Sequence, residues 1–322
     1  MGEGEESQFI PPSEIGVEPK TVIKSEEVDS RVVGGEYVNP SLNLEGVHLI
    51  KVDSLGEGSR TLEFFGKIEA KFAEEENNES FLPMLSPEEK SQVSSRIGTI
   101  KEKLISNPDY RQDFERLLRV HEMAHRTQEV RFKTRESFSK RSDILQNLPE
   151  GNEGNILANE YYKTASLMMV YDEADATVSG LVSAVDVDPE IKNDMLFMSS
   201  AVTWGQYGEK NIDASQAKFV FSASRKGILP PYMPINELAA LAVESGHAEL
   251  PLKLNNGQIL YSELEQTINE TVRRSLLTPE SIINDINKSN ELNKSIDSSL
   301  MAINTEHQKV VDRITDLVNT HQ

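Results

Sequence analysis

The stretch with the clearest chemical potential is His121-Glu122-Met123-Ala124-His125, which contains two of the 6 histidines in the chain. Helical residues four apart project from one face, so both imidazoles can reach one metal ion at about 2.0–2.1 Å. Glu122 lies about 100° around the helix and is placed beside a metal-bound water instead. The spacing therefore predicts two ligands for a zinc ion and one general base.

A catalytic zinc site needs a third protein ligand and an open coordination position. The chain has no cysteine, so any metal must be held by His, Asp or Glu. Glu173 is the first candidate, because it stands in an apolar helical stretch where an unpaired charge is costly. Asp172 and then Glu160 are the alternatives. Asp175 is predicted to support a ligand histidine through its second ring nitrogen.

Hydrolysis of an amide bond also requires a group that stabilises the oxyanion of the transition state. Tyr232 and His247 are the candidates for this role, and Tyr161 and Tyr162 lie on the same predicted helix as Glu173. The alternating segment 217–224 is predicted to be a strand along which an extended peptide substrate could bind.

The histidine motif is expected in the middle of a helix that begins after a clear break. Ser86, Pro87 and Glu89 form a capping-box pattern that predicts a helix to about residue 106. Asn107-Pro108 then reads as the cap of the next helix, whose apolar residues recur at spacings of three and four. A helix expected to end near Gly180 carries Glu173, so two helices position the predicted ligands.

The remaining patterns predict an α+β fold, a helix-rich domain with a small sheet. Strands are expected over 46–54 and 60–72, and a hairpin is expected to turn at Asn256-Gly257. Residues 1–44 have the composition of a disordered acidic arm, and 45–275 are predicted to form the catalytic domain.

Residues 278–322 are predicted to form a C-terminal amphipathic helix with a heptad period. Its seam is apolar except for Ser289, Asn293 and His307, which would weaken a dimeric coiled coil. Packing on its own domain and self-association through this helix are therefore the two alternatives.

Composition narrows the partners and the location. The formal net charge of -20 repels phosphate backbones, so nucleic acid is an unfavourable partner and a basic polypeptide substrate is favoured. No run is long and apolar enough to span a membrane, and the N-terminal residues lack the basic and apolar regions of a signal peptide. We expect either a cytoplasmic protein or one that is secreted without a cleavable signal.

The motif at 121–125, followed by Gln128 and later by Glu173-Ala174-Asp175-Ala176, resembles the zincin metallopeptidases whose third ligand is a glutamate. It is especially similar to bacterial metallopeptidase-like domains found among secreted, effector-like proteins. The resemblance covers about 60 residues of the chain. It implies a zincin-like α+β fold, zinc ligation by His121, His125 and Glu173, catalysis by Glu122, and a role in virulence.

Two other classes of function compete with a zinc peptidase. The pairs Glu122-x-x-His125 and Glu244-x-x-His247 could belong to a di-iron carboxylate centre in a helical bundle. Glu89 or Glu102 and Glu160 or Glu173 would complete that centre. The other class is a non-enzymatic interaction protein in which the motif is accidental or decayed.

Overall fold

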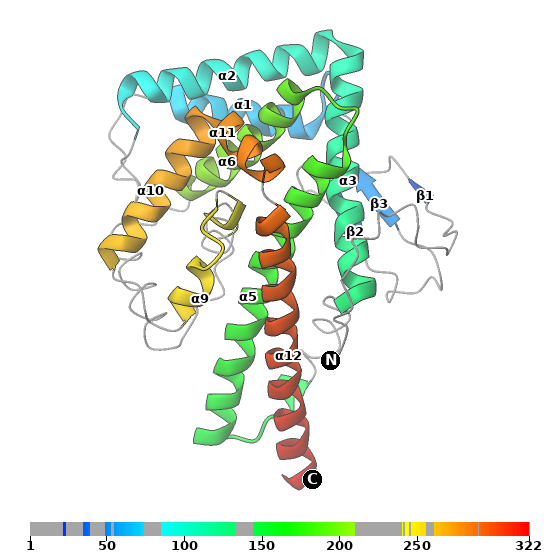
Figure 1. The fold of residues 1–322 in the computed structure, drawn as a ribbon, viewed down its shortest axis with the longest axis vertical. Helices are drawn as coiled ribbons and strands as arrows, with labels where there is room; N and C mark the ends of the chain where they lie inside the picture. The colour runs from blue at the N-terminus through cyan, green and yellow to red at the C-terminus, as the bar shows by residue number, and fades with distance from the viewer. Residues whose placement is uncertain are drawn as a thin grey trace, which may run out of the picture.

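The structure is a computed structural model in which the protein is built almost entirely from helices (Figure 1). It describes residues 22–23, 35–38, 49–52, 55–73, 85–132, 144–209, 240, 242–244, 246–255, 261–288 and 290–321. The helices are α1 (Arg60–Ala73), α2 (Pro87–Ser106), α3 (Pro108–Phe132), α5 (Asn152–Ser183), α6 (Pro189–Glu209), α9 (Leu250–Asn255), α10 (Tyr261–Leu277), α11 (Pro279–Lys288) and α12 (Asn290–His321).

The hydrophobic core of the described residues is formed mainly by helices, so the prediction of an α+β fold was wrong and the described protein is all-α. Three short strands, β1 (Val22–Ile23), β2 (Gly35–Val38) and β3 (Leu49–Val52), pair in the order β1-β3-β2 beside α3. The β1 strand is parallel to β3, and β2 is antiparallel to it. The β1 and β2 strands fall within the segment predicted to be a disordered arm.

Two other strand predictions were also wrong. Residues 60–72 form α1, because Leu62, Phe65, Ile68 and Phe72 recur at helical spacing and are all buried on one face. Residues 250–255, expected to begin a hairpin, form α9. The predicted turn at 256–257 and the predicted strand at 217–224 lie outside the described residues.

The caps that begin α2 and α3 are as predicted. Ser86 caps α2 with a complete capping box to Glu89, and the Asn107 side chain accepts hydrogen bonds from the first turn of α3. Along α3, Tyr110, Phe114 and Leu117 are buried at spacings of four and three. The same face continues to His121, so burial of these residues orients the motif toward the protein interior.

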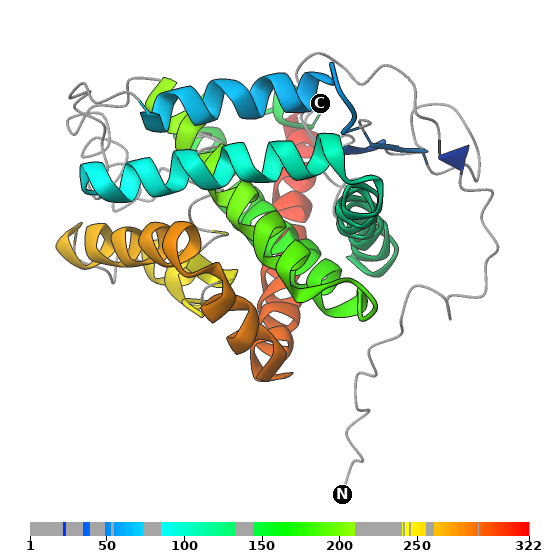
Figure 2. The same ribbon diagram turned by 90° about the horizontal axis from the view of Figure 1, so that it is seen from above.

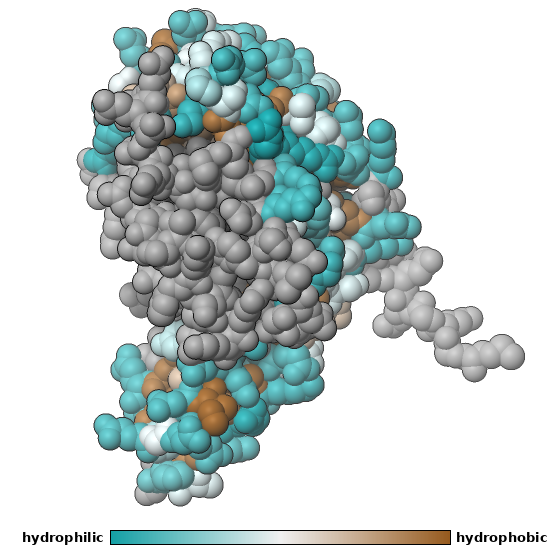
Figure 3. All heavy atoms as spheres, turned by 90° about the vertical axis from the view of Figure 1, so that its left-hand side faces the viewer, coloured by the Kyte–Doolittle hydropathy of each residue, from teal (hydrophilic) through white to brown (hydrophobic). Residues whose placement is uncertain are grey.

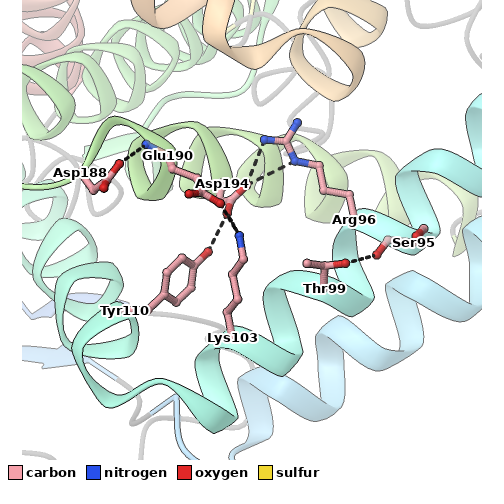
Figure 4. A network of polar contacts seen from close by, with 8 residues as sticks. All are labelled: Ser95, Arg96, Thr99, Lys103, Tyr110, Asp188, Glu190 and Asp194. Carbon is pink, nitrogen blue, oxygen red and sulfur yellow. Dashed lines mark hydrogen bonds and ion pairs between the residues drawn. The ribbon is translucent and has the colours of Figure 1, made fainter.

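Packing between α2, α3 and α6 fixes the start of α3 through one buried carboxylate, that of Asp194 on α6 (Figure 4). Tyr110 donates its hydroxyl to Oδ2 of Asp194 at 2.8 Å, and Arg96 donates to Oδ1 at 3.0 Å. Lys103 Nζ lies 3.5 Å from Oδ2 and 2.5 Å from Glu190. The network joins three helices around a carboxylate that is only 3 % exposed.

Asp194→Ala is expected to lower the free energy of unfolding by about 2–4 kcal/mol, since it removes the acceptor for three donors at a buried position. The expected loss is smaller than for a fully buried ion pair because Arg96 and Lys103 are about a third exposed and can be rehydrated. Urea denaturation measures this free energy of unfolding. Glu190→Gln is the control, with an expected change within about 0.5 kcal/mol, because its side chain is 66 % exposed. Equal effects in both variants would contradict the role of Asp194.

The C-terminal helix packs on its own chain. Figure 1 shows α12 running beside α5, and Ile296, Leu300 and Ile303 share a core with Met168 and Tyr171 of α5. Further along, Val310 and Ile314 pack around Tyr161, and His307 lies against the same ring. The heptad seam therefore has an intramolecular partner, while self-association through this helix remains a prediction.

Figure 2 shows α1 and α2 alongside each other, joined by an ion pair between Lys101 and Glu69. On the face drawn in Figure 3, the described surface is mainly hydrophilic, with hydrophobic side chains in small separate groups. Among the described residues, no helix is both long enough and apolar enough to cross a membrane.

Candidate metal centre

Two helices bring together the three residues predicted to hold the metal. His121 and His125 project from α3, and Glu173 projects from α5, which packs against α3. The two Nε2 atoms are 3.2 Å apart, and each lies 3.5 Å from Oε2 of Glu173. Three ligand atoms around a tetrahedral zinc ion are separated by about 3.4 Å, given bond lengths of about 2.0–2.1 Å. The triangle therefore has the dimensions of three corners of a zinc site.

The α3 and α5 helices approach each other closely where Gly180 lies opposite His121. A methyl group at Gly180 would lie 3.4 Å from the backbone nitrogen of His121 and 3.5 Å from its Cα. A larger side chain would push α3 away. The backbone of His121 is thus held directly against the helix that carries the third ligand.

Exposure differs sharply among the three candidate ligands. The His125 side chain is 2 % exposed and that of His121 is 17 % exposed, whereas that of Glu173 is 47 % exposed. The cluster therefore has one closed side and one side that reaches solvent. A catalytic metal requires such an arrangement, because substrate and water must reach an open coordination position.

The electrostatics of the cluster favour a cation. Burial of His125 opposes a positive charge on its ring. The charge of Glu173 and the hydrogen bond to Asp172 nevertheless raise the pKa of His125 well above its ordinary value. Loss of water around the Glu173 carboxyl tends to raise its pKa. His125 and His121 nevertheless hold the pKa of this carboxyl well below its usual range. A bound divalent cation would supply positive charge beside Glu173 and Asp172.

The second ring nitrogens of both histidines have partners. His125 Nδ1 lies 3.3 Å from Oδ2 of Asp172, and His121 Nδ1 lies 3.4 Å from the hydroxyl of Thr177. Asp172, the alternative third ligand, therefore occupies the supporting position that was predicted for Asp175. Asp175 accepts a hydrogen bond from Ser179 at 3.4 Å. Outer contacts of this kind fix the imidazole planes before a metal arrives.

Asp172→Asn is expected to weaken zinc binding by about 10- to 100-fold, since it removes the charge that orients and polarises His125. Competition with a chromophoric chelator measures the affinity. Asp175→Asn, three residues along the same helix, is the control and is expected to bind zinc as the wild type does. An Asp172→Asn protein with wild-type affinity would contradict the supporting role.

Other predicted residues lie elsewhere. Glu160 forms an ion pair with Arg313 of α12 at 2.6 Å. It therefore has another partner, and it lies on α5 several turns before Glu173. Tyr161 is buried against His307, and Tyr162 belongs to the same end of α5. His247 follows Gly246 at the end of a short helical segment and is not part of the cluster. Tyr232 lies outside the described residues.

Two residues near the cluster were not predicted. Thr177 is the partner of His121, and Glu244 is a buried acidic residue. Burial, together with the charge of Glu173, raises the pKa of Glu244 well above its ordinary value. Glu244 is 4 % exposed, and its Oε2 has no hydrogen-bond partner among the described residues. An acidic residue directly after the apolar run 238–243 was the signal available in the sequence.

The described residues fit a metal ion by three separate observations. The donor atoms are of the types that zinc prefers and have tetrahedral spacing, and both histidines are supported from behind. In addition, the charges of Glu173 and Asp172 beside His125 favour a cation at the cluster. The cluster of His121, His125 and Glu173 can therefore hold a metal ion.

Comparisons with known proteins give no assignment: no family model matches the chain, and neither a curated protein nor a solved structure matches it. The case for function therefore depends on the geometry of the site.

Proposed function

We propose that the protein is a zinc-dependent hydrolase of peptide bonds. The observation that carries this proposal is the triangle of His121, His125 and Glu173, whose atoms have tetrahedral spacing and which reaches solvent at Glu173. Zinc supplies a polarising charge there and lowers the pKa of bound water toward neutrality. The resemblance of the motif to glutamate-ligand zincins supports the same activity, although the helical fold differs from the one it implied.

Within this proposal, the chain's own residues have distinct tasks. Glu122, 9 % exposed and next to His121 on α3, accepts the proton of the attacking water and passes it to the leaving amine. His121 and His125 stay neutral while they bind zinc through Nε2, and Asp172 holds the ring of His125 in place. Burial of His125 keeps water away from the closed side of the site.

The substrate class follows from charge. With a net charge of -20, the protein attracts basic polypeptides more strongly than acidic ones. An unstructured basic protein is therefore the substrate with which to begin. The resemblance to effector-like proteins makes secretion part of the same proposal.

The test combines metal analysis with cleavage. We expect about one zinc ion per purified chain, cleavage of an unstructured basic protein, loss of cleavage with a chelator, and recovery when zinc is added back. Mass spectrometry of the products identifies the cleaved bonds. A protein that contains no metal, even after zinc is added, would refute the proposal and favour an interaction protein with an accidental motif.

A di-metal carboxylate protein is the second candidate, favoured by the all-helical fold and by the buried Glu244 near Glu173. The other residues that it requires have different partners or positions. Glu89 is paired with Arg273, and Glu102 is exposed on α2. About two iron ions per chain, with an absorption band in the near ultraviolet, would favour this candidate over a single zinc ion.

A further inference from the structure

A cavity of about 560 Å³ lies between α2 and α6, beside the Asp194 network drawn in Figure 4. Cavities that bind small molecules commonly measure about 300–1,000 Å³, so a small ligand fits here. Every described lining residue except Ile100 has a polar or charged side chain, and none of them is a proposed metal ligand. The cavity is therefore a second candidate binding site, apart from the metal centre.

The charged groups around this cavity differ in their exposure. The carboxylate of Asp194 is 3 % exposed and already accepts hydrogen bonds from three side chains. Its cationic partners, Arg96 and Lys103, are 30 % and 33 % exposed. Glu190, which pairs with Lys103, is 66 % exposed. A ligand therefore meets positive groups within the cavity and a negative group at its outer side, while the two positive and two negative charges cancel.

One nitrogen of Arg96 is available to a ligand. Its Nε and Nη2 atoms donate to Oδ1 of Asp194, at 3.3 and 3.0 Å, and Cζ lies 4.6 Å from the ring centre of Phe197. Nη1 has no partner among the described residues, and Figure 4 shows a guanidinium nitrogen that points away from Asp194. A guanidinium fixed by an ion pair and an aromatic ring is a well-oriented donor for a carboxylate.

The positive and negative groups are about one helical turn apart. Glu190 and Asp194 are four residues apart on α6, so their Cβ atoms are separated by about 5–6 Å, and Arg96 is bound to Asp194. Oε1 of Glu190 pairs with Lys103, whereas Oε2 has no partner among the described residues. In a single amino acid, one carbon atom joins the ammonium to the carboxylate, but two extended residues span about 7 Å. Two residues with free ends therefore match this spacing.

Neutral polar side chains line the cavity along α2. Ser91, Ser95 and Thr99 recur every four residues on one face, and Gln92 lies next to them. Thr99 donates its hydroxyl to the backbone oxygen of Ser95 at 3.0 Å, so its own oxygen remains an acceptor. Hydroxyl and amide groups can exchange hydrogen bonds with a peptide bond and with uncharged polar side chains.

We propose that the cavity between α2 and α6 binds a dipeptide with free ends, whose carboxylate contacts Arg96 and whose ammonium contacts Glu190. Such a ligand has no net charge, as the lining has none, and its separated charges face groups of opposite sign. The proposal goes beyond the hydrolase activity proposed above and does not depend on it, since the cavity and the metal cluster have no residue in common.

Isothermal titration calorimetry with alanyl-glutamine tests this proposal in the presence of a chelator, which prevents any metal-dependent cleavage of the probe. We expect saturable binding of one dipeptide per chain. Amidation of the carboxylate is expected to weaken binding by about 10-fold or more, and acetylation of the ammonium by about 3- to 10-fold, because Glu190 is the more exposed partner. Free glutamine and alanyl-alanyl-glutamine are each expected to bind about 10-fold more weakly, since their charged ends have a different spacing.

Two variants locate the binding site. Arg96→Lys keeps a positive charge beside Asp194 but loses the planar fork, and Glu190→Gln removes the exposed negative charge. Each is expected to weaken alanyl-glutamine binding by about 10-fold. Glu102→Gln, at an exposed position of α2 outside the cavity lining, is the control and is expected to bind as the wild type does. Thermal melting shows whether each variant is folded.

Absence of alanyl-glutamine binding at millimolar concentrations would overturn the proposal. Equal affinity for the dipeptide and its amide would overturn it too, because the carboxylate would then not be recognised. Wild-type affinity in both Arg96→Lys and Glu190→Gln would place the ligand elsewhere and have the same consequence. Since every titration is made without metal, its result is independent of whether the protein is a zinc hydrolase.

Discussion

Glu122→Gln is expected to lower kcat/KM for peptide cleavage by about 10²–10⁴-fold while leaving zinc bound at the wild-type level. The amide cannot take a proton from water, but it fills the same space on the buried turn of α3. Glu122 lies around the helix from His121 and His125, so its replacement leaves the ligand triangle of these histidines and Glu173 in place. Elemental analysis and steady-state kinetics on one preparation measure both quantities.

Glu102→Gln is the matched control, since Glu102 is exposed on α2 and the substitution makes the same change of charge. It is expected to keep wild-type activity and zinc content. Equal activity in Glu122→Gln and the wild type would exclude Glu122 as the base. Loss of zinc from Glu122→Gln would instead mean that this carboxyl helps to hold the ion.

Glu173→Ala is expected to reduce zinc affinity by more than the roughly 10- to 100-fold typical of outer contacts, because it removes one of three ligands. Activity is expected to fall with it. The same change removes the charge that raises the pKa of His125 in the metal-free protein, so His125 should lose its proton at lower pH. Elemental analysis gives the zinc content, and histidine titration by magnetic resonance gives the pKa.

Glu160→Ala is the control for this prediction because it lies on the same helix but pairs with Arg313 instead of a histidine. It is expected to keep the wild-type zinc content. If both variants retained zinc, the third ligand would lie elsewhere, and the assignment of Glu173 would fail. If both lost zinc, the effect would be attributed to α5 as a whole.

Features set by short-range spacing could be predicted from the sequence. The capping box of Ser86 and Glu89 depends on residues three apart, and the face shared by His121 and His125 depends on residues four apart. Glu173 could be predicted because a charge in an apolar helix must be compensated. Its pairing with both histidines across α3 and α5 agrees with that reasoning.

The fold class was predicted wrongly because short apolar runs are ambiguous between helix and strand. The strand prediction for residues 60–72 disregarded the helical spacing of Leu62, Phe65 and Phe72, which lie on one buried face. Packing of that face against α2 stabilises the helix. Only the tertiary environment decides such cases, since local propensities differ by small free energies.

The sequence by itself determined which residues can bind a metal, because ligand type and helical spacing are local properties of α3 and α5. Only the tertiary structure decided which residues support those ligands. Asp172 rather than Asp175 faces His125, and Thr177 faces His121. The physical reason is that such contacts depend on the rotation of one packed helix relative to another, which Gly180 and the buried faces fix and which no short-range pattern encodes.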